Sequence, residues 1–297
     1  MKYELTNGAM SASVSTLGAE LVSLKRDGKE YLWQGDPAYW HGQSPLLFPN
    51  CGRFWQNLYR HDGTTYELKA HGFARTTEFT VVGRSETEIT LGMHSTEETL
   101  RVYPFAFFLF VTYRLGTSSI DVEWFVRNEG DEEMHFQIGA HPAFYLPDFD
   151  PADRDAVRGY FSFNADGKQP ITWFEPVEKG CVDPAQPRTL RLDGEGMLPI
   201  TAKTFDCDTY VIESAHISAC TLHDAARRPM LTVGFHMPVL ALWAPTAQHP
   251  DCPFVAIEPW TGSCDTTGYD GELANRRHIQ HLAPAAHFRT AYTITLH

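Results

Sequence analysis

The chain contains the stretch Phe254-Val255-Ala256-Ile257-Glu258-Pro259-Trp260-Thr261-Gly262, in which an apolar run ends in a single acid. The four apolar residues at its start predict a buried strand. Pro259 favours extended backbone at Glu258 and so fixes how that side chain leaves the strand. A carboxyl between this strand and Trp260 is expected to be partly desolvated, which raises its pKa toward the range useful for a general base. The alternative is a strand-end glutamate that meets solvent or a salt bridge.

Short strands joined by tight turns are predicted on both sides of this stretch. Asp27-Gly28 and Asp62-Gly63 are hairpin turn signals between β-prone segments, and the first lies between expected strands at 21–24 and 31–33. The clearest strands are 107–113 and 120–126, and the second alternates apolar with polar residues, which predicts one buried face. Residues 95–98 resemble a capping box and predict one short helix.

The remaining pattern predicts an all-β fold. No helical period persists beyond about two turns, and no linker or clean repeat interrupts residues 1–297. Residues 164–203 are rich in glycine and proline and predict long excursions between short strands. Roughly twenty strands favour one domain built from two large, mainly antiparallel sheets with long loops.

Composition excludes several classes of partner. The 297 residues include 24 Lys and Arg against 37 Asp and Glu, a net charge of −13 that argues against nucleic acid and anionic membranes. The sequence has neither an apolar run long enough for a membrane span nor an N-terminal secretion signal. The six cysteines form no C-x-x-C pair, so we expect reduced thiols in a cytoplasmic protein rather than a zinc site or disulfides.

Four loops combine a glycine or proline with a charged or imidazole side chain. They are Cys51-Gly52-Arg53, His71-Gly72-Phe73-Ala74-Arg75, Gly139-Ala140-His141-Pro142 and Glu258-Pro259-Trp260. His141 and Glu258 each precede a proline, and the restricted backbone suits a general acid and a general base because both depend on positioning. The alternatives are a turn or core histidine at 141, and surface salt bridges for Arg53 and Arg75.

Other polar groups carry weaker signals. His216, His223 and His236 lack a metal-ligand spacing, so no metal site is predicted from them. Asp206 and Asp208 form a short acidic pair, and these residues either form part of a turn or bind a substrate. No phosphate-binding loop or dinucleotide motif is present.

Three motifs together resemble one known family. The blocks H-G-F-A-R at 71–75, A-H-P at 140–142 and I-E-P-W at 257–260 occur in the same order as in the aldose 1-epimerase (galactose mutarotase-like) family, most closely in its short bacterial branch. The resemblance covers essentially the whole chain. It implies a β-supersandwich of two sheets with the site in the cleft of one concave sheet.

The resemblance also implies roles for individual residues. Glu258 matches the general base and His141 the general acid, while His71 and Arg53 match residues that orient the sugar. Asp208 resembles a substrate-binding aspartate, although the residues that follow it depart from the family pattern. Ala70 and the pair Asn50-Cys51 also depart from it, and both departures are expected to alter the sugar preference. Two further residues join the expected binding set, Trp260 as a flat apolar face and Arg75 as the candidate phosphate partner.

The implied activity is mutarotation, the exchange of α and β anomers of a free hexose. Glu258 is expected to start ionised and His141 protonated, and no cofactor or metal is required. The expected partner is a small sugar, and the assembly a monomer or homodimer. Free sugars are favoured over 6-phosphates because the net charge opposes a dianion and Arg53 is already committed to hydroxyls.

Three other functions remain open from sequence. A non-catalytic carbohydrate-binding protein would not need Glu258 and His141 as a pair. A hexose-6-phosphate mutarotase would use Arg53, Arg75 and Lys69 to seat the phosphate. A glycoside hydrolase or lyase would need a second carboxylate about 5–10 Å from Glu258, for which Asp208 is the candidate.

Overall fold

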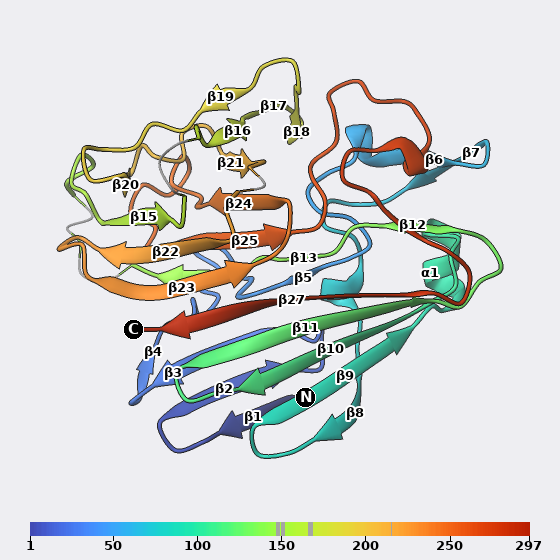
Figure 1. The fold of residues 1–297 in the computed structure, drawn as a ribbon, viewed down its shortest axis with the longest axis horizontal. Coiled ribbons are helices and arrows are strands. Elements are labelled where there is room, and N and C mark those ends of the chain that lie inside the picture. The colour runs from blue at the N-terminus through green and yellow to red at the C-terminus, as the bar shows by residue number, and fades with distance from the viewer. Residues whose placement is uncertain (147–148, 150–151, 166–168, 215) are drawn as a thin grey trace.

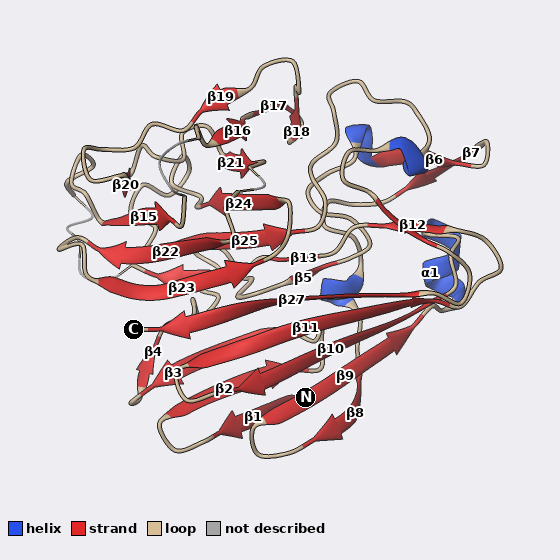
Figure 2. Cartoon of the chain, viewed as in Figure 1, coloured by secondary structure: helices blue, strands red, loops and turns tan. Residues whose placement is uncertain are grey.

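Antiparallel strands are the main secondary structure of the computed structural model, which describes residues 1–146, 149, 152–165, 169–214 and 216–297 (Figures 1 and 2). Two large sheets dominate, as the sequence predicts. No helix in the described ranges is long and apolar enough to cross a membrane.

The larger sheet has nine strands and carries the longest hydrogen-bonded ladders. Its order is β20 (Met197–Ile200), β15 (Gly159–Phe163), β22 (Ala219–Asp224), β23 (Pro229–Phe235), β27 (His287–Leu296), β11 (Ser119–Asn128), β10 (Phe107–Leu115), β9 (Glu88–His94) and β8 (Thr80–Arg84). In β11 the buried residues alternate with more exposed ones, which confirms the predicted one-sided strand.

The second sheet has eight strands and contains the apolar stretch that ends at Glu258. Its strands are β19 (Arg188–Thr189), β16 (Thr172–Phe174), β21 (Thr209–Ile212), β24 (Val239–Trp243), β25 (Phe254–Trp260), β13 (Gly139–Ala140) and β5 (Leu46–Leu47), with β14 (Ala143–Tyr145) also paired to β25. Every residue of β25 is buried, so this strand lies at the centre of the protein.

Smaller sheets extend the two large ones. A four-stranded sheet joins β1 (Lys2–Thr6), β2 (Met10–Ser15), β3 (Leu21–Arg26) and β4 (Lys29–Glu30), and the two-stranded pairs are β6 (Leu58–His61) with β7 (Thr64–Glu67), β12 (Met134–Phe136) with β26 (Gln280–Leu282), and β17 (Pro176–Glu178) with β18 (Cys181–Val182). Asp27 and Asp62 have positive φ angles, as do the glycines after them, which confirms both predicted hairpin turns.

Helical structure is confined to short segments in the described part of the chain. The α-helix α1 spans Glu97–Val102, and Thr96 caps it by accepting from the backbone N–H of Thr99. Three single turns of 3₁₀-helix are η1 (Trp55–Asn57), η2 (Ala74–Thr76) and η3 (Leu273–Asn275).

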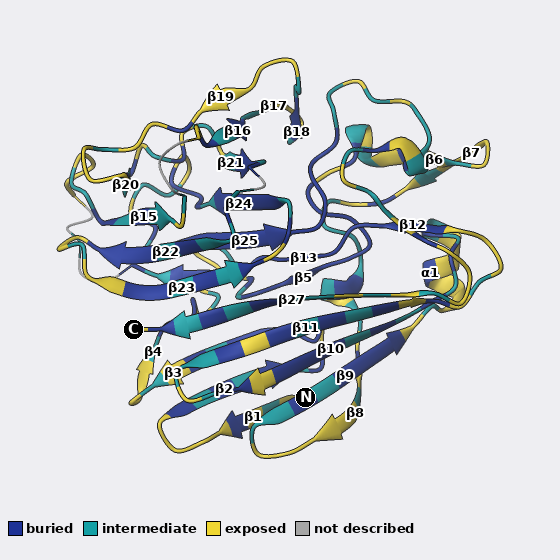
Figure 3. Cartoon of the chain, viewed as in Figure 1, coloured by how far each residue is buried: buried dark blue, intermediate teal, exposed yellow. Residues whose placement is uncertain are grey.

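The two faces of the eight-stranded sheet pack against different apolar clusters. Figure 3 shows that β25 is buried and β24 largely so. Leu240 and Leu242 of β24 join the main core, whereas Val239 and Ala241 join a smaller cluster with Trp260. Because Ala241 lies opposite Glu258 in the ladder, Glu258 projects from the face with the smaller cluster. The carboxyl is therefore turned away from the main core.

An interruption in the ladder explains the proline within β25. The N–H groups of Ile257 and Thr261 donate to Pro142 O and Ile138 O of the neighbouring segment. Pro259, which has no N–H, falls between them, where His141 and Pro142 separate β13 from β14. The same gap therefore accommodates the proline and places His141 beside β25.

Candidate active site

A cavity of about 310 Å³ opens over the face of the eight-stranded sheet from which Glu258 projects. All seven side chains predicted from the sequence line it: Arg53, His71, Arg75, His141, Asp208, Glu258 and Trp260. They come from β25, from the loops after β5 and β13, from the segment at η2 and from the residue before β21. The fold thus brings together groups that lie far apart in the sequence.

His141 and Glu258 are in direct contact at the floor of the cavity. Nε2 of His141 lies 3.3 Å from Oε1 of Glu258, and the exposed fractions of the two side chains are 9% and 1%. The backbone N–H of His141 donates to Pro45 O, which holds the loop in place. The alternative from sequence was a core or turn histidine, and the structure gives this buried imidazole a carboxylate neighbour at the cavity.

Burial favours the uncharged form of both groups. It raises the pKa of Glu258 well above its usual range, and the nearby charge of Asp208 adds to this effect. Burial likewise lowers the pKa of His141 to about 3, and the charge of Arg75 contributes. These two shifts favour a pair whose one titratable proton lies on Glu258 while His141 is neutral. This arrangement differs from the expected ionised Glu258 and protonated His141, although the number of protons is the same.

Trp260 lies next to the carboxyl. Its indole N–H is close enough to oppose the rise in the pKa of Glu258, but it makes no well-formed hydrogen bond in the described structure. Oε2 of Glu258 is also buried without a hydrogen-bond partner among the described residues. A polar ligand would satisfy both groups, because buried donors and acceptors are normally paired.

His71 is held as a neutral donor. The backbone N–H of Gly52 donates to Nδ1 of His71 at 3.2 Å, which leaves the proton on Nε2. Burial lowers the pKa of His71, and His141 and the two arginines of the site reinforce the shift. The adjacent Gly72 has φ +69°, and a Cβ there would lie 2.2 Å from Phe48 O, so only glycine fits.

Arg53 and Arg75 form no ion pair with the described residues. Neither side chain makes a hydrogen bond or ion pair with any residue that the structure describes, so the alternative of surface salt bridges is wrong. Arg53 is exposed and Arg75 is half-buried. Burial lowers the pKa of Arg75, an effect that Glu20 partly offsets. Two unpaired guanidinium groups at one cavity are suited to sugar hydroxyls or an anionic substituent.

Asp208 lies at the rim of the cavity. It is exposed, has φ +68°, and accepts a hydrogen bond from the indole N–H of Trp243 at 3.3 Å. Asp206 does not line the cavity. Of the two acids that the sequence left open, the structure therefore places only Asp208 at the site.

Two tryptophans that no sequence motif marks surround His141. Trp40 stacks on the imidazole with ring centroids 4.8 Å apart and an interplanar angle of 26°. Trp243 meets the same ring edge-on at 5.4 Å. Together they exclude water from the imidazole. The only signal for Trp243 was its position at the end of a predicted strand, and Trp40 lies in a loop without a motif.

Comparisons with known proteins relate the whole chain to one family. The family model described as aldose 1-epimerase matches residues 1–273. The plasmid-encoded LacX protein of Lactococcus lactis subsp. lactis is 32% identical over 309 residues, covering 100% of this chain and 99% of the relative. A galactose mutarotase-like protein from Lactobacillus casei superposes with a TM-score of 0.91 at 28% identity, with 100% of both chains covered. A galactose mutarotase related enzyme from Lactobacillus acidophilus gives 0.90 at 28% identity, covering 100% of this chain and 97% of that one.

Proposed function

Because this chain belongs to the aldose 1-epimerase family, we propose that it interconverts the α and β anomers of a free hexose. The observation that carries the proposal is the buried contact of 3.3 Å between His141 and Glu258. Mutarotation removes a proton from the 1-hydroxyl and adds one to the ring oxygen, and both oxygens are bound to the same carbon. An acid and a base in contact are suited to two such close sites.

The single titratable proton of the His141–Glu258 pair supports the same reaction. In the proposed sequence Glu258 takes the proton of the 1-hydroxyl while His141 donates one to the ring oxygen. This requires the shared proton to lie on His141, and the short contact allows it to pass from Glu258 when sugar hydroxyls solvate the carboxylate. The ring opens to the aldehyde, C1 turns about the C1–C2 bond, and closure reverses both transfers. The pair is neutral overall at the start and end of each cycle.

The other side chains support binding and orientation in this proposal. The Nε2–H of His71 and the guanidinium groups of Arg53 and Arg75 donate to oxygens of the sugar, whereas Asp208 accepts from a hydroxyl. Trp260 contributes an apolar face. The cavity of about 310 Å³ lies at the lower end of the range of about 300–1,000 Å³ for small-molecule sites, which suits one monosaccharide.

A second candidate substrate is a hexose 6-phosphate. The unpaired guanidinium groups of Arg53 and Arg75 favour it, because a phosphate would supply the missing counterion. The net charge of −13 and the acid Asp208 at the site weigh against a dianion. We therefore retain the free hexose as the primary substrate.

Catalysis distinguishes this proposal from a carbohydrate-binding protein or a glycoside hydrolase. Exchange of anomers is measured by NMR on free glucose and galactose with protein and with buffer alone. Acceleration without release of any product supports the proposal, whereas binding without acceleration for every sugar tested overturns it.

The proposal includes a small sugar as the partner instead of nucleic acid or membrane, a monomeric or homodimeric assembly, and a cytoplasmic location.

A further inference from the structure

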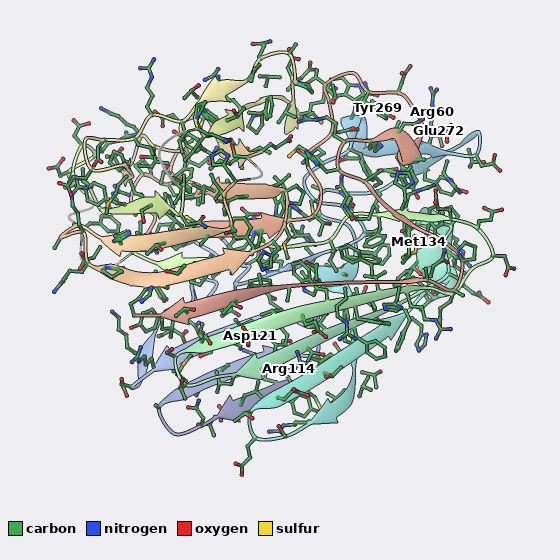
Figure 4. The ribbon with its side chains drawn as sticks, in the orientation of Figure 1. Arg60, Arg114, Asp121, Met134, Tyr269 and Glu272 are labelled. Carbon is green, nitrogen blue, oxygen red and sulfur yellow. The ribbon has the colours of Figure 1, made fainter. Side chains whose placement is uncertain are left out.

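We propose that Glu133, His135 and His281 bind a divalent transition-metal ion, with Zn²⁺ as the best match to two imidazoles and one carboxylate. The three residues lie on and beside the β12–β26 pair, and none of them lines the sugar cavity. Figure 4 labels Met134, the first residue of β12, which lies between Glu133 and His135 in the chain.

The pairing of β12 with β26 brings the two imidazoles together. His135 lies directly opposite His281 in this antiparallel ladder, so both side chains leave the same face. Their ring centroids are 4.8 Å apart. The arrangement is fixed by backbone pairing and is independent of a flexible loop.

The donor atoms already converge. Oε2 of Glu133 lies 3.0 Å from Nδ1 of His281 and 3.9 Å from Nδ1 of His135. All three donor atoms lie within 4.8 Å of one another. Ligands about 2.0–2.2 Å from a tetrahedral ion are themselves about 3.4 Å apart, so small side-chain adjustments would complete the coordination.

A buried nitrogen without a partner points to a ligand at this place. His135 is 6% exposed, and its Nδ1 has no hydrogen-bond partner among the described residues. The same atom faces the carboxylate of Glu133 at a distance too long for a hydrogen bond. A metal ion between the two would satisfy the nitrogen, which distinguishes this cluster from an ordinary surface ion pair.

The surroundings favour a cation and leave it a route of entry. The side chains of His281 and Glu133 are about half exposed, at 48% and 52%. The adjoining hollow is lined by further acids, Asp62, Glu132 and Glu272, of which Figure 4 labels Glu272. A fourth coordination position would remain open to water.

The bound ion would act as a structural clamp. β26 follows η3 in the segment that returns from β25, and Gln280 at its start donates to Thr261 O directly after β25. Linking β26 to β12 would tie this return segment to the strand that leads toward His141. We therefore expect metal to raise thermal stability by mass action.

The test compares metal binding by tag-free protein and matched variants. Calorimetry with Zn²⁺ should give one equivalent for the wild type, and Co²⁺ should give the visible absorption of a nitrogen-ligated ion. His281→Ala and Glu133→Gln should each weaken binding by at least about tenfold, since even the loss of a residue that only hydrogen-bonds to a metal ligand costs about 10–100-fold. Both positions are half exposed, so the fold should persist.

Two controls locate the ion. His94→Ala removes an exposed histidine whose Nδ1 lies 3.3 Å from Glu129 Oε2 in a pair without a third ligand, and it should bind Zn²⁺ like the wild type. His141→Asn should also retain one equivalent, because the sugar cavity is a separate place. Absence of binding in the wild type, or equal affinity in His281→Ala, would overturn the proposal. Zn²⁺ should raise Tm in the wild type but not in His281→Ala, and an equal rise in both would contradict it.

Discussion

The imidazole of His141 reaches Oε1 of Glu258 through the interruption between β13 and β14, at 3.3 Å. The same interruption lies where Pro259 has no N–H to offer the neighbouring strand. The two prolines, Pro142 and Pro259, therefore belong to one local arrangement that places His141 in contact with Glu258. Its energetic consequence is a buried pair that favours a single shared proton.

The Glu258→Gln variant should be more stable than the wild type, by a margin that grows as the pH rises from 4.5 to 8. The folded-state pKa of Glu258 is raised above its ordinary value of 4.5, so its contribution to stability is complete below pH 4.5 and is lost at higher pH. The loss amounts to about 1.4 kcal/mol for each pH unit up to the folded pKa. The amide never ionises, so the variant should have the higher Tm at pH 8, with a gap that closes toward pH 4.5.

The control for this stability effect is Glu86→Gln, which changes an exposed acid. Thermal denaturation of both variants and the wild type is measured between pH 4.5 and 8. Glu86→Gln should show no pH-dependent gap. A Glu258→Gln variant less stable than wild type at pH 8 would show that the carboxyl is ionised in the folded protein.

The activity should be flat across neutral pH. Burial lowers the pKa of His141 to about 3 and raises that of Glu258, so the one-proton state of the pair persists between these limits. Activity should fall at acid pH, where the pair gains a second proton, and at alkaline pH, where it loses its only one. The measurement is kcat/KM from pH 5 to 8. An inflection near the ordinary histidine value of 6.5 would contradict the assignment.

His141→Asn and His71→Asn should fail in different ways. His141 touches Glu258 and is assigned the proton transfer, so its loss should lower kcat by about 10²-fold or more. His71 is a fixed neutral donor through its bond from Gly52, so its loss should chiefly raise KM. Steady-state kinetics on one hexose separates the two effects. Equal losses of kcat at unchanged KM would refute this division.

Free hexoses should be better substrates than their 6-phosphates. Arg53 and Arg75 are unpaired, but both lie in the cavity where the proposed reaction uses them for sugar oxygens. The comparison is kcat/KM for glucose, galactose and glucose 6-phosphate in wild type and Arg75→Ala. A preference for the phosphate of about tenfold, or about 1.4 kcal/mol, that disappears in Arg75→Ala would promote the second candidate.

Local sequence patterns predicted much of the fold and singled out Glu258 and His141, whereas the sugar-binding roles of Arg53, His71 and Asp208 came from the family resemblance. The Asp-Gly turns and the alternation in 120–126 act over a few residues, so they can be read directly. Residues 31–33 were expected to form a strand, but only Leu32 makes an isolated bridge, to Phe144. Its partner is remote in the sequence, which explains the error.

What escaped prediction depends on contacts between distant segments. Trp40 covers His141 only because a loop folds over β14, and no local spacing reveals this. The facing of His135 and His281 likewise arises from the β12–β26 pairing. The lack of counterions at Arg53 and Arg75 also becomes visible only once the surrounding residues are placed.

The most direct test of the proposed function is the mutarotation rate of Glu258→Gln. The amide keeps the shape of the carboxyl and its contact with His141, but it cannot accept a proton from the 1-hydroxyl. Anomer exchange of a free hexose is followed by NMR at pH 7, with circular dichroism to show that the fold is retained. The account predicts a loss of about 10²-fold or more. A folded variant that keeps more than about a tenth of the wild-type rate would show that Glu258 is not the base.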